Sequence, residues 1–207
     1  KDKTDPSKKA LNMADQIPLR IPERENYNFF LELPEVDVSK IKVDTVKGSQ
    51  FLMPLFEYSG ARAGCGETPY LKLMSQLFGD RAIVANATGC SSIYGGNLPT
   101  TPWAKNKEGK GPAWSNSLFE DNAEFGLGFR LAIDKQREFA VELMKKMSSQ
   151  IGEKLVDELI ANPQKSDPEI ALQRKLVGEL KNKLKGINSD EAKMLSSLAD
   201  SLIRKSV

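Results

Sequence analysis

Residues 68–89 pair a short helical pattern with an apolar, β-rich run, and this pair constrains the fold more than any other feature. Thr68 and Pro69 are typical of a helix start, apolar residues recur at helical spacing over 71–77, and Gly79 ends the pattern. The run that follows, RAIVANATG, is bounded by turn-forming residues, as a buried parallel strand would be. A helix followed by a buried strand predicts an α/β layer.

The carboxyl-terminal residues 151–207 have a different composition, in which Lys, Glu, Leu and Ala dominate and aromatic residues are absent. Cap signals and helical spacing of Leu predict three helices, over 151–162, 166–186 and 189–206. Leucine at this spacing is typical of plain helix packing, and we assign no chemistry to the segment.

The amino-terminal residues 1–50 are polar and contain four spaced prolines, which interrupt helices before they grow. We expect this arm to be mostly extended, with Phe29, Phe30 and Leu31 as its anchors. Residues 98–116 are rich in Pro, Gly and Lys and hold both tryptophans, so they predict a long ordered loop.

After that loop, Ser117 and Glu120 have the spacing of a capping box, and they open a long helix over residues 118–147.

Charge and composition exclude several classes of function. The net charge is +2 and the sequence pI about 8.4, so no basic field indicates nucleic acid or acidic membranes as partners. No apolar run approaches the roughly 20 residues that span a bilayer, and we expect a soluble, cytoplasmic protein without a membrane partner. The absence of histidine excludes Ser-His-Asp triads and histidine metal ligands from this chain.

The two cysteines, Cys65 and Cys90, each lie beside glycines, and Cys90 follows the predicted strand where open α/β sheets bind ligands. Two thiols without a motif spacing leave metal binding, redox exchange and plain burial open. A redox pair is the least favoured because the spacing matches no dithiol pattern. An iron-sulfur cluster needs four thiolates as a rule, so these two are not enough for one.

Glu67 lies at the start of the predicted helix 68–79. Capping of the free backbone N–H groups is sufficient to explain a carboxylate there. A functional interpretation has Glu67 bind a cationic or hydrogen-bonding part of a ligand in the Cys65 loop. No catalytic residue can be assigned from these patterns.

The stretches FEYSGARAGCGETPYLKLMSQLFGDRAIVANATGCSSIYGG and NKEGKGPAWSNSLFEDNAEFGLGF carry a family resemblance. They closely resemble the thiamine-diphosphate-binding domain of pyruvate:ferredoxin (or flavodoxin) oxidoreductases. The match is specific in its motifs over about residues 24–140, and the helical tail is in keeping with it. The resemblance implies an anaerobic enzyme that converts pyruvate and coenzyme A to acetyl-CoA and carbon dioxide. Electrons pass through iron-sulfur clusters to ferredoxin or flavodoxin.

The resemblance also assigns residues. Cys65 and Cys90 match two of the four thiolates that hold the cluster nearest the thiamine, and Glu67 and Cys90 match positions that contact thiamine diphosphate. The family's loop reads Cys-Ala-Gly-Cys-Gly-Glu, whereas this chain has Arg62 at the first position. Arginine cannot bind iron, so this departure puts a normal four-cysteine cluster in doubt.

A second departure concerns the metal. The family's Gly-Asp-Gly motif for Mg²⁺ and diphosphate is absent from these residues, so we expect a fragment that is inactive alone and depends on the remainder of the polypeptide. We expect a homodimer when the protein is full length. The alternative is a non-catalytic binding or scaffold module that keeps the fold without a cluster.

The fold predicted from the element order and the resemblance is α/β. It is a partial three-layer thiamine-diphosphate-binding fold with a parallel sheet, followed by an all-helical carboxyl-terminal segment. The predicted organisation is an arm over 1–50, the first half of the thiamine-diphosphate domain over 51–150, and a helical segment of the same domain over 151–207. With half of the sheet missing, an exposed strand edge is expected.

Overall fold

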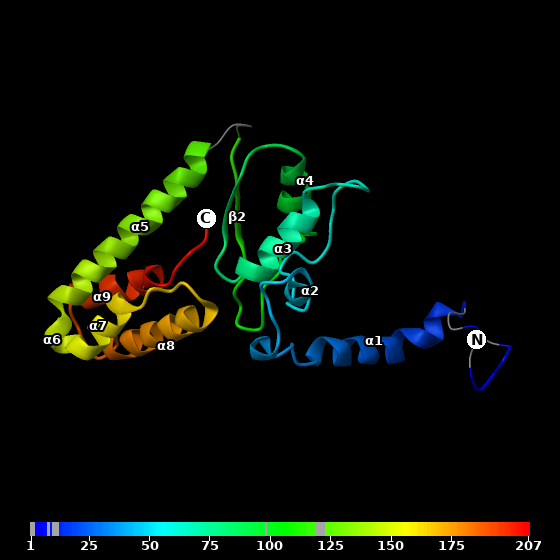
Figure 1. The fold of residues 1–207 in the computed structure, drawn as a ribbon, viewed down its shortest axis with the longest axis horizontal. Helices are drawn as coiled ribbons and strands as arrows, with labels where there is room; N and C mark the ends of the chain where they lie inside the picture. The colour runs from blue at the N-terminus through cyan, green and yellow to red at the C-terminus, as the bar shows by residue number, and fades with distance from the viewer. Residues whose placement is uncertain (1–2, 8, 10–12, 98, 119–122) are drawn as a thin grey trace. The chain divides into compact units, whose positions relative to one another are not determined.

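The computed structural model describes residues 3–7, 9, 13–97, 99–118 and 123–207. The chain divides into a unit of residues 1–42 and a unit of residues 43–207. The two predicted segments 51–150 and 151–207 therefore lie within one unit. Figure 1 follows the elements in chain order by colour.

The first unit contains the helix α1 (Gln16–Glu32) and the short 3₁₀ helix η1 (Val38–Lys40). The prediction of a mostly extended arm is thus wrong for residues 16–32. Pro18 lies in the first turn of α1, where backbone N–H groups make no hydrogen bonds within the helix, so the lack of an N–H group costs nothing there. Pro22 lies in the interior of α1, and the helix continues past it. None of the residues in α1 is buried, so Phe29, Phe30 and Leu31 do not act as anchors within the described chain.

The second unit begins with α/β structure. Its elements are α2 (Val46–Ser49), α3 (Thr68–Phe78), β1 (Ile83–Asn86), α4 (Cys90–Gly96) and β2 (Ala113–Asn116). The predicted helix 68–79 and the strand after it are confirmed. The strand β2 was missed, because its four residues follow the loop signals of residues 98–112.

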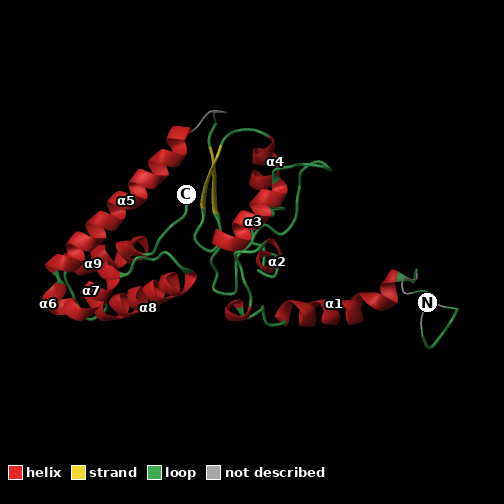
Figure 2. Ribbon diagram, viewed as in Figure 1, coloured by secondary structure: helices red, strands yellow, loops and turns green. Residues whose placement is uncertain are grey.

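The strands β1 and β2 pair in parallel, with Ile83 opposite Ala113 and Asn86 opposite Asn116. On its other side β1 meets the end of the chain, where the Ile83 amide donates to the Ser206 carbonyl at 2.7 Å. In Figure 2 the two strands lie between α5 and the pair α3 and α4. The described residues of this sheet are half-buried or exposed, not fully buried as predicted, because only two strands and one bridging residue build it.

The connection between the strands passes through α4 and the loop after it. The indole of Trp114 lies against the backbone of α4, and a Cβ atom added at Gly95 would stand 2.9 Å from it. Glycine at this position therefore allows the strand and the helix to approach closely. Phe56, Tyr94 and Trp103 form an aromatic cluster beside this contact, with ring centroids 4.9 Å apart for Phe56 and Trp103.

The rest of the unit is helical, as the sequence predicts. The helices are α5 (Ala123–Lys146), α6 (Ser148–Ile151), α7 (Glu153–Ala161), α8 (Asp167–Leu184), α9 (Asp190–Leu198) and η2 (Ala199–Leu202). They bury a shared hydrophobic core in which Met144, Leu180 and Leu195 are completely buried. The capping box predicted at Ser117 and Glu120 cannot be compared, since Glu120 lies outside the described residues.

Among the described residues, no helix is long and apolar enough to cross a bilayer.

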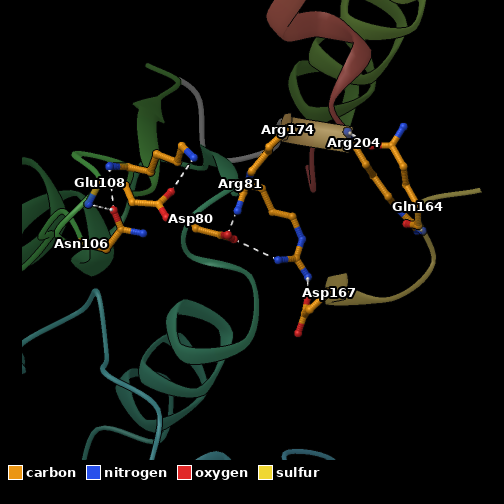
Figure 3. Close-up of polar contacts among 9 residues, drawn as sticks. Asp80, Arg81, Asn106, Glu108, Gln164, Asp167, Arg174 and Arg204 are labelled. Carbon is orange, nitrogen blue, oxygen red and sulfur yellow. Dashed lines mark hydrogen bonds and ion pairs between the residues drawn. The ribbon is translucent and has the colours of Figure 1, made fainter. Parts of the chain in front are cut away.

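Ion pairs connect the helical segment to the start of β1, as Figure 3 shows. Asp80 accepts from Arg81 at 2.9 Å and from Arg174 of α8 at 2.7 Å. Arg81, whose side chain is 10% exposed, also donates to Asp167 at 3.1 Å. The two pairs of Asp80 are partly shielded from solvent, so they are stronger than ordinary surface salt bridges, whereas the Asp167 side chain is 58% exposed.

We expect Asp80→Asn to lower the free energy of unfolding by about 1–2 kcal/mol, because two guanidinium groups would lose a charged acceptor. Urea unfolding of the chain followed by circular dichroism measures the change. Glu138→Gln is the matched control, since it removes an exposed pair with Lys135 and should have no measurable effect. Equal stability of the Asp80 variant and the control would contradict the assigned role of these ion pairs.

Candidate functional site

Two asparagines meet at the carboxyl ends of the parallel strands. Asn86 ends β1 and Asn116 ends β2, and they are partners in the strand register. The side-chain amide of Asn86 donates to Oδ1 of Asn116 at 2.8 Å. Because ligands of parallel sheets bind beyond this end of the strands, the pair marks the edge on which a site is expected.

Two serines of α4 bind the same asparagines. The Ser91 hydroxyl donates to Oδ1 of Asn86, and the Ser92 hydroxyl donates to Oδ1 of Asn116, both at 2.8 Å. The Gly89 amide in turn donates to Oγ of Ser92 at 3.0 Å. These bonds fix the start of α4, and with it Cys90, to the ends of both strands.

The loop that carries Cys65 makes a tight turn that depends on the glycine before the thiol. The Cys65 amide donates to the Arg62 carbonyl at 3.1 Å, which closes a turn. Gly64 occupies the turn with φ +79°, a conformation that favours glycine. Upstream, a Cβ atom added at Gly60 would come within 3.0 Å of Cβ of Tyr94, so the loop packs closely on α4.

The Cys65 loop and the start of α4 line one cleft of about 500 Å³. The structure therefore brings together all the residues that the sequence marked, which come from positions 62–67 and from position 90. Cys90 is exposed, Cys65 is half-buried, and both are free thiols. The cleft is lined by Gly60, Ala61, Arg62, Ala63, Gly64, Cys65, Glu67, Cys90, Ile93 and Tyr94.

Glu67 does not cap α3. It occupies the N-cap position with helical backbone angles, but its side chain makes no capping hydrogen bond. The capping hydrogen bond expected of this carboxylate is thus not formed, while its position at the amino-terminal end of the helix dipole is as expected. Glu67 is exposed and lines the cleft, so its carboxylate is available to a ligand.

Tyr94 is the residue of the cleft that sequence reasoning missed. Its side chain is 5% exposed, and its buried hydroxyl has no hydrogen-bond partner within bonding geometry among the described residues. Burial raises the pKa of Tyr94 above its ordinary value, and the nearby Glu67 carboxylate raises this pKa further. Tyr94 follows Cys90 by four positions, a spacing that places both on one face of a helix and could have identified it.

The donor set of the cleft limits which metals it can bind. Within the described part of the chain, no three Cys, Asp, Glu or His side chains are grouped so that they could hold a metal ion. Arg62 adds a permanent positive charge and no lone pair to the cleft. What the described residues offer is two thiols, a carboxylate, a neutral phenol and a guanidinium.

Comparison with known proteins gives the cleft its context. Pyruvate-flavodoxin oxidoreductases from Trichormus variabilis and Nostoc sp. are 57% and 56% identical to the chain over 211 and 213 residues. A pyruvate:ferredoxin oxidoreductase from Moorella thermoacetica is 56% identical over 145 residues, which cover 70% of the chain. The chain belongs to the pyruvate:ferredoxin and pyruvate-flavodoxin oxidoreductase family.

The chain spans only part of these family members. It covers 18% of the length of the Trichormus and Nostoc proteins and 12% of the Moorella protein. No protein-family model matches the chain. The residues of the cleft lie in a segment that the chain shares with these relatives, and their individual roles as ligands stay predictions.

The cleft geometry predicts that Cys65 and Cys90 can be joined. We expect a short thiol-to-thiol reagent such as dibromobimane to link them within one molecule, because both line the same cleft and neither is fully buried. Mass spectrometry of a digest would detect the linked peptides, and Cys65→Ser should abolish them. Two singly modified thiols without any link would contradict the cleft.

Proposed function

We propose that the cleft is one wall of a thiamine-diphosphate site in a 2-oxoacid oxidoreductase that acts on pyruvate. The observation that carries the proposal is the meeting of Glu67, Cys65 and Cys90 beyond the carboxyl ends of two parallel strands. Relatives named for pyruvate oxidation and for flavodoxin or ferredoxin support it. The chain is then one part of a longer polypeptide that forms the thiamine-diphosphate-binding fold.

The proposed reaction is oxidative decarboxylation. Pyruvate loses carbon dioxide, its acetyl group passes to the thiol of coenzyme A, and two electrons leave one at a time for ferredoxin or flavodoxin. Bound thiamine diphosphate supplies the electron sink for decarboxylation. In this chain Glu67 and Cys90 would contact the cofactor, because both side chains are exposed and line the cleft.

An iron-sulfur cluster fits the described residues only in part. Cys65 and Cys90 face one cleft, but the first ligand position of the family loop holds Arg62, which cannot coordinate iron. A four-thiolate cluster would need at least two further thiolates from outside the chain. We therefore derive no electron-transfer step through a cluster held here.

Magnesium and the diphosphate require other residues as well. The described residues contain no group of carboxylates that could hold a metal ion. We infer that the ligands for Mg²⁺, together with the contacts to pyruvate and coenzyme A, come from other parts of the polypeptide or of a homodimer.

The alternative is a scaffold module that keeps the fold and binds no cluster, with Arg62 marking the loss of electron transfer. Both proposals retain the cleft. They differ in whether the longer protein binds thiamine diphosphate and reduces an electron carrier. Measurements on the holoprotein, and not on the chain alone, therefore distinguish the two proposals.

The isolated chain should neither bind thiamine diphosphate with Mg²⁺ tightly nor turn over pyruvate. The physical reason is that the described residues contain no group of three ligands that could hold the Mg²⁺ ion needed to neutralise the diphosphate. Isothermal titration calorimetry with and without Mg²⁺ tests the binding. Micromolar, Mg²⁺-dependent affinity would show that the ligands have been misplaced.

Arg62→Cys should increase cluster binding in the longer polypeptide, because it restores a thiolate at the family's ligand position. Iron content and visible absorption after anaerobic reconstitution measure the effect, and Arg62→Ser is the control that removes the charge without adding a ligand. In the isolated chain the same change should still leave the cluster one ligand short. A stoichiometric four-iron cluster on the unmodified chain would contradict this assignment.

A further inference from the structure

Two buried side-chain donors of the described residues lack a hydrogen-bond partner, the Tyr94 hydroxyl and the Trp103 indole N–H. Both belong to the aromatic cluster around Phe56, in which Tyr94 and Phe56 have ring centroids 6.0 Å apart. A buried donor without a partner weakens a fold, since it has lost its hydrogen bonds to water. An acceptor from outside the apolar cluster is therefore expected for at least one of them.

Only one of the two donors lines the cleft. Tyr94 is among the cleft residues and Trp103 is not. The Tyr94 ring is held in place by the close approach of Gly60 and by the edge-on contact with Phe56. Its hydroxyl is thus a fixed donor, and an acceptor in the cleft could satisfy it.

Glu67 is the carboxylate that lines this cleft, and its side chain is not committed elsewhere. It makes no capping bond to α3, and no ion pair with it is found among the described residues. Burial raises the pKa of Tyr94, and the Glu67 carboxylate raises it further, first as a nearby hydrogen-bond acceptor and then through its charge. The phenol therefore stays protonated near neutral pH and can only donate to this carboxylate.

We propose that Tyr94 is a positioning residue, whose hydroxyl donates a hydrogen bond to the Glu67 carboxylate when a cofactor fills the cleft. The bond satisfies the buried hydroxyl and holds the exposed carboxylate in one orientation toward the ligand. The inference rests on the proposed function, in which Glu67 contacts thiamine diphosphate. It adds a residue that supports Glu67 and that touches the cofactor only through it.

The test uses the holoenzyme that carries this chain, with Tyr94→Phe, Glu67→Gln and the double variant. We expect Tyr94→Phe to weaken thiamine-diphosphate binding in the presence of Mg²⁺ by about fivefold to tenfold, the usual effect of one hydrogen bond to a charged group. The double variant should bind no more weakly than Glu67→Gln alone, because the two side chains act as a unit. Trp103→Phe is the matched control, since it removes the other unpartnered donor and should leave the affinity unchanged.

A second readout separates positioning from a merely structural role. Without cofactor, Tyr94→Phe should melt at the same or a higher temperature than the wild type, because it deletes a buried hydroxyl that has no partner. Additive losses of affinity in the double variant, an unchanged affinity, or a lower melting temperature of the cofactor-free variant would each overturn the inference. If the wild-type holoenzyme itself binds no thiamine diphosphate, the proposed function is overturned as well. This outcome is distinguishable because the wild type and every variant would then show no binding.

Discussion

The parallel pairing of β1 with β2 is the constraint on which the cleft depends. Parallel strands cannot be joined by a tight turn, so the chain must leave β1 and return through a crossover connection, which here contains α4. That connection carries Cys90 and Tyr94 past the carboxyl end of the sheet. The same register sets Asn86 beside Asn116, and the two amides bind the serines that begin α4. A shift of one residue in the pairing would separate all of these groups.

The helical segment stabilises a sheet that has little core of its own. Most of the buried apolar residues lie between α5 and η2, whereas β1 is only half-buried along its length. Arg174 of α8 reaches the turn before β1 through Asp80, and Ser206 continues the sheet on the side of β1 away from β2. Residues 151–207 therefore help to hold in place the start of the strand whose other end leads to the cleft.

Patterns of local origin were predicted well from the sequence, and those that depend on tertiary contacts were not. The helix over 68–79, the strand after it and the carboxyl-terminal helices follow from caps and periodicity. The strand β2 is recognisable only through its pairing with β1, and α1 contradicts a rule that treats every proline as a helix breaker. The nearness of Cys65 and Cys90 was implied by the family resemblance, which makes both thiols ligands of one cluster. Tyr94 was missed because its burial and its unpartnered hydroxyl depend on tertiary contacts, although its spacing from Cys90 placed it on the same helix face.

The unpartnered hydroxyl also bears on the choice between an enzyme part and a scaffold module. A module selected only for its fold gains nothing from a buried phenol without a partner, which costs about 1–3 kcal/mol, when phenylalanine would fill the same space. A scaffold likewise has no need of a carboxylate at the N-cap of α3 that caps nothing. The unpartnered hydroxyl and the uncapped carboxylate both become favourable once a ligand supplies their missing contacts. The free energy of ligand binding then includes the hydrogen bonds that these groups gain. The two features therefore favour the proposed enzyme part over the scaffold module, although Arg62 offers no lone pair with which to bind iron.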